Sequence, residues 1–419
     1  MASTAPRLSE ESAEALEPEG SGPSPVGPLA LVSSPEAREE ARETPSWKER
    51  LRAFRARHAK AELALLFFAS FAYDILTLPR IDNRFTLTKQ GLFLAVLGWL
   101  LWLELRWREG AAPPRGLSRV WRFREDALHL LLGGLLSPYT LFYFKSASGL
   151  TSFLFLASVF GVLVANELPR FRARGPVVRV GLYAFCLTSY FAYLLPVVRG
   201  YYSGMLFLWA AGLSAAVMGV LAVVVHGRRR EGRHPWWHIL VPGWGVQAVL
   251  LGLYALKAIP PVPLSLLASG IYHDVQVVKG PRGRDYRLLH EGGGWRPWAR
   301  GDQDFRARPG DRVYFFASIF APTSFKPQYP GDKGTRLLLR WEYDDPKKGW
   351  TDFHTYGGLY LGQGGRDGGF RTFAYLTAPR PGDWRVSLET EDGREVGRLS
   401  FTVTPDNSTE EREFKVTAG

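Results

Sequence analysis

The sequence predicts an α-helical transmembrane bundle of seven spans, followed by an all-β, immunoglobulin-like sandwich domain. Seven apolar stretches fill residues 63–258, and the loops between them alternate between Arg-rich and Arg-poor. After residue 270 the hydrophobic period changes from helical to two. The expected segments are a disordered acidic cytoplasmic tail (1–45), a basic juxtamembrane segment (46–61), the membrane domain (62–258), a Pro-rich linker (259–269), a periplasmic β-sandwich (270–404) and a polar tail (405–419).

The formal charge of +12 is unevenly distributed along the chain. Residues 1–45 carry a net charge of −6, residues 46–259 carry +16 and residues 260–419 carry +2. Because the basic residues flank apolar spans, they indicate orientation in a lipid bilayer and not nucleic-acid binding. The single cysteine, Cys186, excludes an intrachain disulfide and a metal site built from cysteines.

The N-terminal tail is rich in Glu, Pro, Ala and Ser and lacks the apolar core of a cleaved signal peptide, so the first span is expected to act as an uncleaved signal. The next segment repeats Trp47, Leu51, Phe54 and His58 at helical spacing among basic residues. It reads either as an amphipathic helix on an anionic leaflet or as the basic flank of the first span. Both interpretations place it in the cytoplasm.

Most of the expected spans have the length that a bilayer requires. They cover Leu63–Leu78, Gly91–Leu105, Ala127–Phe144, Gly149–Leu168, Val180–Val198, Met205–His226 and Ile239–Ala258. A continuous helix over 127–168 would be about 63 Å long, about twice the hydrocarbon thickness, and Pro138 would kink it. The turn at Lys145–Ser148 therefore predicts a helical hairpin.

The basic residues give the bundle an orientation. The segment before the first span and the loops after spans two, four and six hold 20 Lys and Arg residues. The opposite side holds five, Arg80, Arg84, Lys89, Lys145 and Arg199. The positive-inside rule then places the N-terminus in the cytoplasm and the C-terminal domain outside it.

The C-terminal part alternates apolar and polar residues in short runs. Residues 335–343, 384–389 and 397–403 each place large apolar side chains on one face. Turn signals such as Pro381-Gly382-Asp383 separate these runs. Seven or eight short strands at this spacing predict an antiparallel sandwich.

Several stretches carry a family resemblance. In the C-terminal part they are FFASIFAPT (315–323), RWEYDD (340–345), GGRDGGFR (364–371), PGDWRV (381–386) and TEDGREVGRLSFTV (390–403). In the membrane part they are YDILTLPRID (73–82), FYFKSAS (142–148), LVANELPRF (163–171) and IPPVPLSLLASGIYHDV (259–275). Together they resemble multi-pass bacterial proteins that carry the domain of unknown function 2914. The resemblance implies an envelope location and a β domain, and it implies no activity.

The Gly-rich stretch 362–369 is the most unusual loop of the predicted domain. Arg366 and Arg371 could hold a carboxylate or phosphate there, with Asp367 orienting one of them. The alternative is a glycine-rich hairpin with an internal Arg–Asp pair. Trp341 and Trp384 lie on inward faces of predicted strands, where core packing is the simpler role and an aromatic sugar-binding platform the alternative.

Three polar residues stand out in the membrane domain. Asp74 lies within the first span and Lys257 at the outer end of the last, so the two could pair. Otherwise Lys257 snorkels to the interface while Asp74 bonds a neighbouring helix or Arg80. His129 reads either as a proton relay or as a hydrogen-bonded histidine of the bundle.

The sequence contains no GxSxG, HExxH or Walker motif, so we predict no catalytic residues, no cofactor and no metal site. The favoured hypothesis is an inner-membrane protein that presents a periplasmic β-sandwich to an envelope protein or glycan. The alternative is a transporter or membrane-embedded enzyme that uses Asp74.

Overall fold

The computed structural model describes residue 47 and residues 81–108, 110, 116, 118–167, 175–226, 237–280, 283–292, 300–327, 334–362 and 369–419. The chain forms two compact units, Met1–Phe68 and Ala69–Gly419, and the description below concerns the second. The expected first span, residues 63–78, lies outside the described residues.

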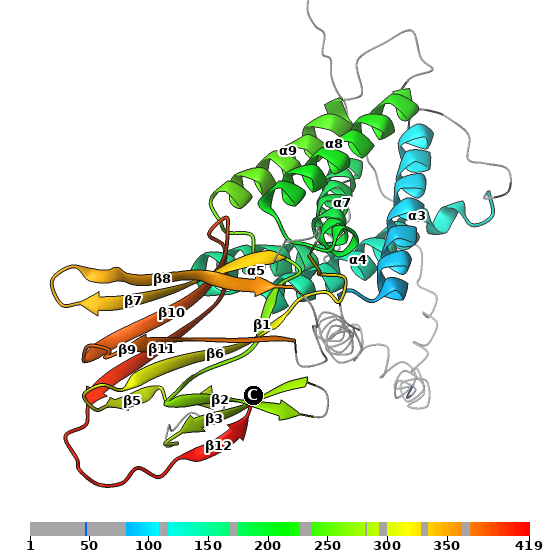
Figure 1. Ribbon diagram of the computed structural model, residues 1–419. Coiled ribbons are helices and arrows are strands. Elements are labelled where there is room, and N and C mark those ends of the chain that lie inside the picture. Colours follow the sequence, from blue (N-terminus) through cyan, green and yellow to red (C-terminus); the bar gives the residue numbers. More distant parts are fainter. Residues whose placement is uncertain are drawn as a thin grey trace, which may run out of the picture. The chain divides into compact units, whose positions relative to one another are not determined.

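Six described helices are long and apolar enough to cross a membrane (Figure 1). They are α3 (Arg84–Arg108), α4 (Arg124–Ser146), α5 (Gly149–Glu167), α7 (Pro176–Arg199), α8 (Gly204–His226) and α9 (Trp237–Ala255), with a short 3-10 turn, η2 (Trp121–Phe123), before α4. Each coincides with one of the expected spans two to seven. The hairpin between α4 and α5 is present, because only Ala147 and Ser148 separate the two helices.

Helix α7 contacts α3, α4, α8 and α9, which makes it the central helix of the bundle. Buried polar side chains join the helices around it. The Ser214 hydroxyl of α8 accepts a hydrogen bond from Gln247 Nε2 of α9 at 2.7 Å and one from Thr188 Oγ1 of α7 at 3.0 Å. Such bonds hold helices together where the apolar surroundings supply little driving force.

The part after α9 is built of strands arranged in three sheets. The strands are β1 (Ser265–Tyr272), β2 (Asp274–Gly280), β3 (Gly283–His290), β4 (Arg300–Gly301), β5 (Asp304–Ala307), β6 (Arg312–Phe320), β7 (Thr335–Asp345), β8 (Gly349–Leu361), β9 (Phe370–Thr377), β10 (Gly382–Thr390), β11 (Glu395–Pro405) and β12 (Lys415–Ala418). Their orders are β4-β1-β6-β9, β5-β11-β10-β7-β8 and β12-β3-β2, which we call the inner, outer and third sheets.

The inner and outer sheets share one core. Strand β6 supplies Phe315 and Ile319 from the inner sheet, while β7 and β10 supply Trp341 and Trp384 from the outer sheet. Both tryptophans are 0% exposed, as the alternation in 335–343 and 384–389 predicted. The two faces therefore pack as in a β-sandwich.

The third sheet was not predicted. Strand β6 is apolar on both faces, since Phe316 points away from the main core and packs with Tyr272, Val275 and Leu288. Strands β2 and β3 cover that second face. A strand that is buried on both sides has a continuous apolar sequence without alternation. The alternation pattern therefore did not indicate a third sheet.

The described strands also depart from the predicted antiparallel arrangement at two edges. Strand β4 pairs in parallel with β1, and β5 pairs in parallel with β11. The expected linker 259–269 is shorter, because β1 already begins at Ser265. The expected polar tail 405–419 includes β12, which pairs with β3.

Candidate functional site

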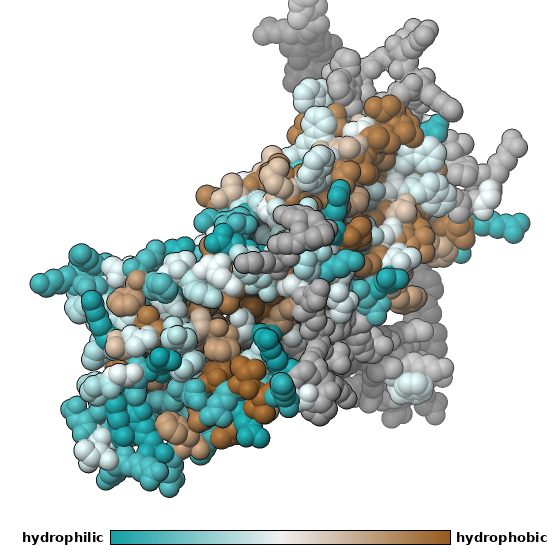
Figure 2. Space-filling model, viewed as in Figure 1, coloured by the Kyte–Doolittle hydropathy of each residue, from teal (hydrophilic) through white to brown (hydrophobic). Residues whose placement is uncertain are grey.

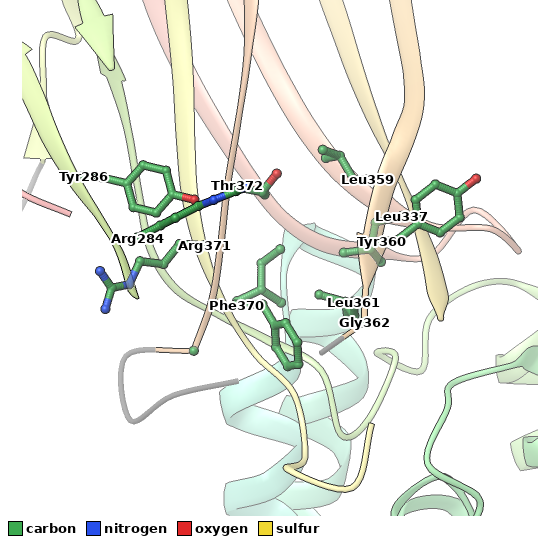
Figure 3. Close-up of a pocket in the computed structure, with 12 residues that line it drawn as sticks. Arg284, Tyr286, Leu337, Leu359, Tyr360, Leu361, Gly362, Phe370, Arg371 and Thr372 are labelled. Carbon is green, nitrogen blue, oxygen red and sulfur yellow. The ribbon is translucent and has the colours of Figure 1, made fainter. Parts of the chain in front are cut away.

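A groove opens where β8 and β9, the outermost strands of the outer and inner sheets, face each other. We call it the edge groove; its volume is about 410 Å³. Twelve residues line it: Arg284, Tyr286, Ile319, Leu337, Leu359, Tyr360, Leu361, Gly362, Gly369, Phe370, Arg371 and Thr372. They come from all three sheets, because Arg284 and Tyr286 belong to β3. Figure 3 shows Arg284, Tyr286 and Arg371 on one side and Leu359, Leu337 and Tyr360 on the other.

The floor of the edge groove is apolar and its rim is cationic. Ile319 and Leu337 are 0% exposed and belong to the main core. Among the described lining residues the only charged side chains are Arg284 and Arg371. A site of this size with an apolar floor and a few convergent polar groups is typical of small-molecule sites.

Arg371 is the one predicted site residue that the structure places in the groove. Its Nη1 donates to the carbonyl oxygen of Gly419 at 2.8 Å and lies 3.7 Å from Asp285 Oδ1. These contacts hold the guanidinium in position. Arg366 and Asp367, the other two residues predicted to bind an anion, lie outside the described residues.

Trp384 does not lie at the groove. Its ring is enclosed in the core beside Tyr343, Phe353 and Phe401, and its Nε1 donates to the carbonyl oxygen of Arg380 at 2.8 Å. This placement favours the packing role over the sugar platform. The exposed aromatic at the groove is Tyr360, which no sequence pattern singled out.

The β domain meets the helices through the turn between β10 and β11. Arg394, with 5% of its side chain exposed, donates from Nη2 to the carbonyl oxygen of Tyr254 at 2.6 Å and from Nη1 to that of Ile259 at 3.2 Å. Its Cζ lies 3.3 Å from the centroid of the Tyr254 ring. Asp392 completes the group, since its Oδ2 accepts from Arg394 Nε at 2.9 Å and from the Tyr254 hydroxyl at 3.1 Å. A cation thus caps the C-terminal turn of α9, where the helix dipole favours positive charge.

Further hydrogen bonds join the β domain to three other places on the helical part. Thr323 N donates to Asp82 Oδ2 at 2.9 Å, just before α3. Ser148, between α4 and α5, donates to Glu395 Oε1 at 2.6 Å. Between α7 and α8, Tyr202 N donates to Thr335 Oγ1 at 3.0 Å. All of these contacts lie at the same end of the bundle as the C-terminus of α9.

Of the three intramembrane candidates, two are described. Lys257 is exposed beyond the end of α9. Its Nζ lies against Gly393 in the β10–β11 turn, because a Cβ added to that glycine would come within 2.6 Å of Nζ. Asp74, its expected partner, lies outside the described residues. His129 of α4 is half-buried and lines a cavity of about 160 Å³ with Asp126, Asn166 and others at the Arg-rich end of the bundle.

A second polar cluster lies in the β domain around His273. Its Nε2 is 3.7 Å from Glu291 Oε1 and 3.7 Å from Asp302 Oδ2, and its ring stacks on Phe305 with centroids 4.1 Å apart. Burial lowers the pKa of His273 to about 4, although Asp302 opposes this shift. Arg412 pairs with Glu291 and so belongs to the same cluster. Because its pKa is lowered, the His273 imidazole is neutral near neutral pH. Within the described part of the chain, no group of three or more His, Cys, Asp or Glu residues is arranged to hold a metal ion.

Comparison with known proteins identifies part of the β domain. The family model described as "Protein of unknown function (DUF2914)" matches residues 334–403. The match begins at β7 and ends within β11, so it covers five consecutive strands, including the Arg394 turn and both strands that flank the edge groove, β8 and β9. A search of curated proteins finds no match to the chain. In this segment the chain is similar to a family of unknown function, and the helices lie outside the match.

Proposed function

We propose that the protein is an integral protein of a bacterial inner membrane that presents its β domain on the periplasmic side, where the edge groove binds an envelope ligand. The N-terminus lies in the cytoplasm. The observation that carries the proposal is that every described hydrogen bond between helix ends and β domain lies at the Arg-poor end of the bundle.

Membrane insertion is supported by the outward faces of the helices. Leu130, Leu150 and Val198 are 70% exposed or more, and Trp209 and Val223 are above 60%. Figure 2 shows hydrophobic residues gathered over the helices and a mostly hydrophilic face on the strands. A bundle this apolar on its outside is stable in lipid and insoluble in water.

The described helices and the charges of the loops between them support this placement of the β domain. The loops after α3, α5 and α8, together with the adjoining helix ends, hold 14 basic residues, whereas the junction end holds six, including Lys257. The presence or absence of a span before α3 changes the side of the N-terminus and leaves the β domain on the Arg-poor side. The positive-inside rule assigns that side to the periplasm.

Binding is supported by the edge groove, which offers a concave, partly apolar site in a domain without a catalytic arrangement among its described residues. The alternative of a transporter or membrane-embedded enzyme rests on Asp74, which lies outside the described residues. No described feature favours it over the binding role.

A reporter enzyme fused after Gly419, active only outside the cytoplasm, tests the proposal. We expect activity in intact cells, and a matched fusion after Val120, at the Arg-rich end, should be inactive. An inactive Gly419 fusion together with an active Val120 fusion would overturn the proposed orientation.

A further inference from the structure

We propose that the edge groove binds an anionic amphiphile, a molecule with a hydrocarbon chain and a phosphate or carboxylate headgroup, taken from the adjacent membrane leaflet. This inference rests on the proposed function and names its ligand class.

The position of the groove is the first reason. Leu361 pairs with Thr335, and Thr335 Oγ1 is the acceptor for Tyr202 N between α7 and α8. On the other wall, Phe370 pairs with Ile319, which is close in sequence to the Thr323 contact with Asp82. The groove therefore opens at the end of the β domain that faces the helices. A lipid from that leaflet can reach it without leaving the membrane surface.

The floor of the groove is the second reason. Ile319, Leu337, Leu359 and Leu361 are each 8% exposed or less, and Phe370 stands half-buried beside them (Figure 3). A hydrocarbon chain would pack against the half-buried Phe370 and the exposed Tyr360 ring above these buried side chains and remove their apolar surface from water. A purely polar glycan would leave it unmatched and would desolvate its own hydroxyls in exchange.

The charge of the rim is the third reason. Arg371 is held in place by the Gly419 carbonyl oxygen, and Arg284 is exposed on β3 of the third sheet. Asp285 lies 3.7 Å from Arg371 but is half-exposed to water, so it offsets the rim charge only in part. Two guanidinium groups with planar arrays of donors suit a phosphate or carboxylate headgroup.

The test uses the full chain in nanodiscs of a zwitterionic phosphatidylcholine. A small fraction of the lipid carries a photoactivatable group near the end of its acyl chain, on either phosphatidylglycerol or phosphatidylcholine. After illumination, mass spectrometry locates the crosslinked peptides. We expect the phosphatidylglycerol probe to label the peptides of β8 and β9 that line the groove and the phosphatidylcholine probe to spare them.

Charge reversal separates recognition from mere proximity. Arg284→Glu should lower groove labelling by about tenfold, since it removes a charge-assisted contact and adds repulsion. Arg287→Glu is the matched control, because Arg287 is also exposed on β3 but does not line the groove. Arg371→Gln provides a second variant, and its melting temperature shows whether the loss of the Gly419 contact disturbs the fold.

Three results would overturn the proposal. They are equal groove labelling by both lipids, equal effects of Arg284→Glu and Arg287→Glu, and loss of groove labelling in excess glycerol phosphate, which would identify a soluble anion as the ligand. Nanodiscs expose both faces of the bilayer, so this experiment does not depend on the orientation in the cell. A failed reporter test and a failed crosslinking test are therefore distinguishable.

Discussion

Arg394 is a single side chain on which the junction between the helices and the β domain depends. It satisfies two carbonyl oxygens at the end of α9, covers the Tyr254 ring and neutralises Asp392. Replacing it with alanine would leave two carbonyl groups at the end of α9 without their donor, and Asp392, whose side chain is 28% exposed, without its charged partner.

We predict that Arg394→Ala lowers the free energy of unfolding by about 1–3 kcal/mol, the cost of leaving buried carbonyl groups without their hydrogen-bond donor. Chemical unfolding of the purified chain in detergent measures this change. Arg336→Ala is the control, because Arg336 is 43% exposed and its carboxylate partner, Glu391, is 72% exposed. It should cost less than about 1 kcal/mol. Equal losses in the two variants would show that the Arg394 contacts do not secure the junction.

His273 gives the β domain a stability that depends on pH. Its pKa is lowered from 6.5 to about 4, so the unfolded chain takes up this proton before the folded chain does. The contribution of neutral His273 is thus complete above the unfolded pKa and is lost as the pH falls toward the folded pKa. The charged groups around it are Glu291, Asp302, Asp311, Asp406 and Arg412.

We predict that unfolding becomes easier as the pH falls from about 7 to about 4 and that His273→Gln reduces this slope. Thermal melts of both proteins at several pH values provide the measurement. The comparison uses the slope, so a constant loss of stability in the variant does not affect it. An unchanged slope would mean that other groups cause the pH dependence.

At the scale of single residues, buried core positions could be predicted from the sequence better than side-chain contacts between distant elements. Trp341 and Trp384 were expected in the core because their strands alternate, and both are fully buried. Arg394 was not singled out, since a cation that caps a distant helix has no local pattern. Arg284 was not singled out either. It lies on the third sheet, which packs on the second apolar face of β6 and was not predicted.

Among the elements, the helices were predicted best. Spans two to seven each correspond to a described helix, because a bilayer demands a long apolar run with polar ends. The strands of the matched segment 334–403 were predicted where one face is buried. Strands β4, β5 and β12 escaped prediction because they are short and lie at sheet edges.

The association of α7, α8 and α9 depends on the Ser214 hydrogen bonds. We predict that Ser214→Ala weakens the bundle by about 0.6–2 kcal/mol, since Gln247 loses its partner in an apolar setting. Unfolding in mixed micelles of a mild and a denaturing detergent measures the loss. Ser158→Ala is the control, because Ser158 is exposed on α5 and bonds only within its own helix. Equal losses of stability in the two variants would show that the Ser214 hydrogen bonds do not hold α7, α8 and α9 together.

On the scale of the whole molecule, the proposed orientation combines the loop charges with the junction contacts. The loop charges distinguish an Arg-rich from an Arg-poor end of the bundle, and the junction contacts place the β domain at the Arg-poor end. The edge groove opens toward that end, so orientation decides which leaflet can supply its ligand. The sidedness of the β domain is therefore the central claim.

Cysteine accessibility tests this claim most directly, because the chain has one cysteine and Cys186 is 0% exposed. In a Cys186→Ser background, one variant carries Lys347→Cys in the exposed β7–β8 turn and another carries Val120→Cys between α3 and α4. A membrane-impermeant maleimide is applied to intact spheroplasts and, in parallel, to lysed ones. We predict that the cysteine at position 347 is labelled in intact spheroplasts and that the cysteine at position 120 is labelled only after lysis. The reverse pattern would contradict the account.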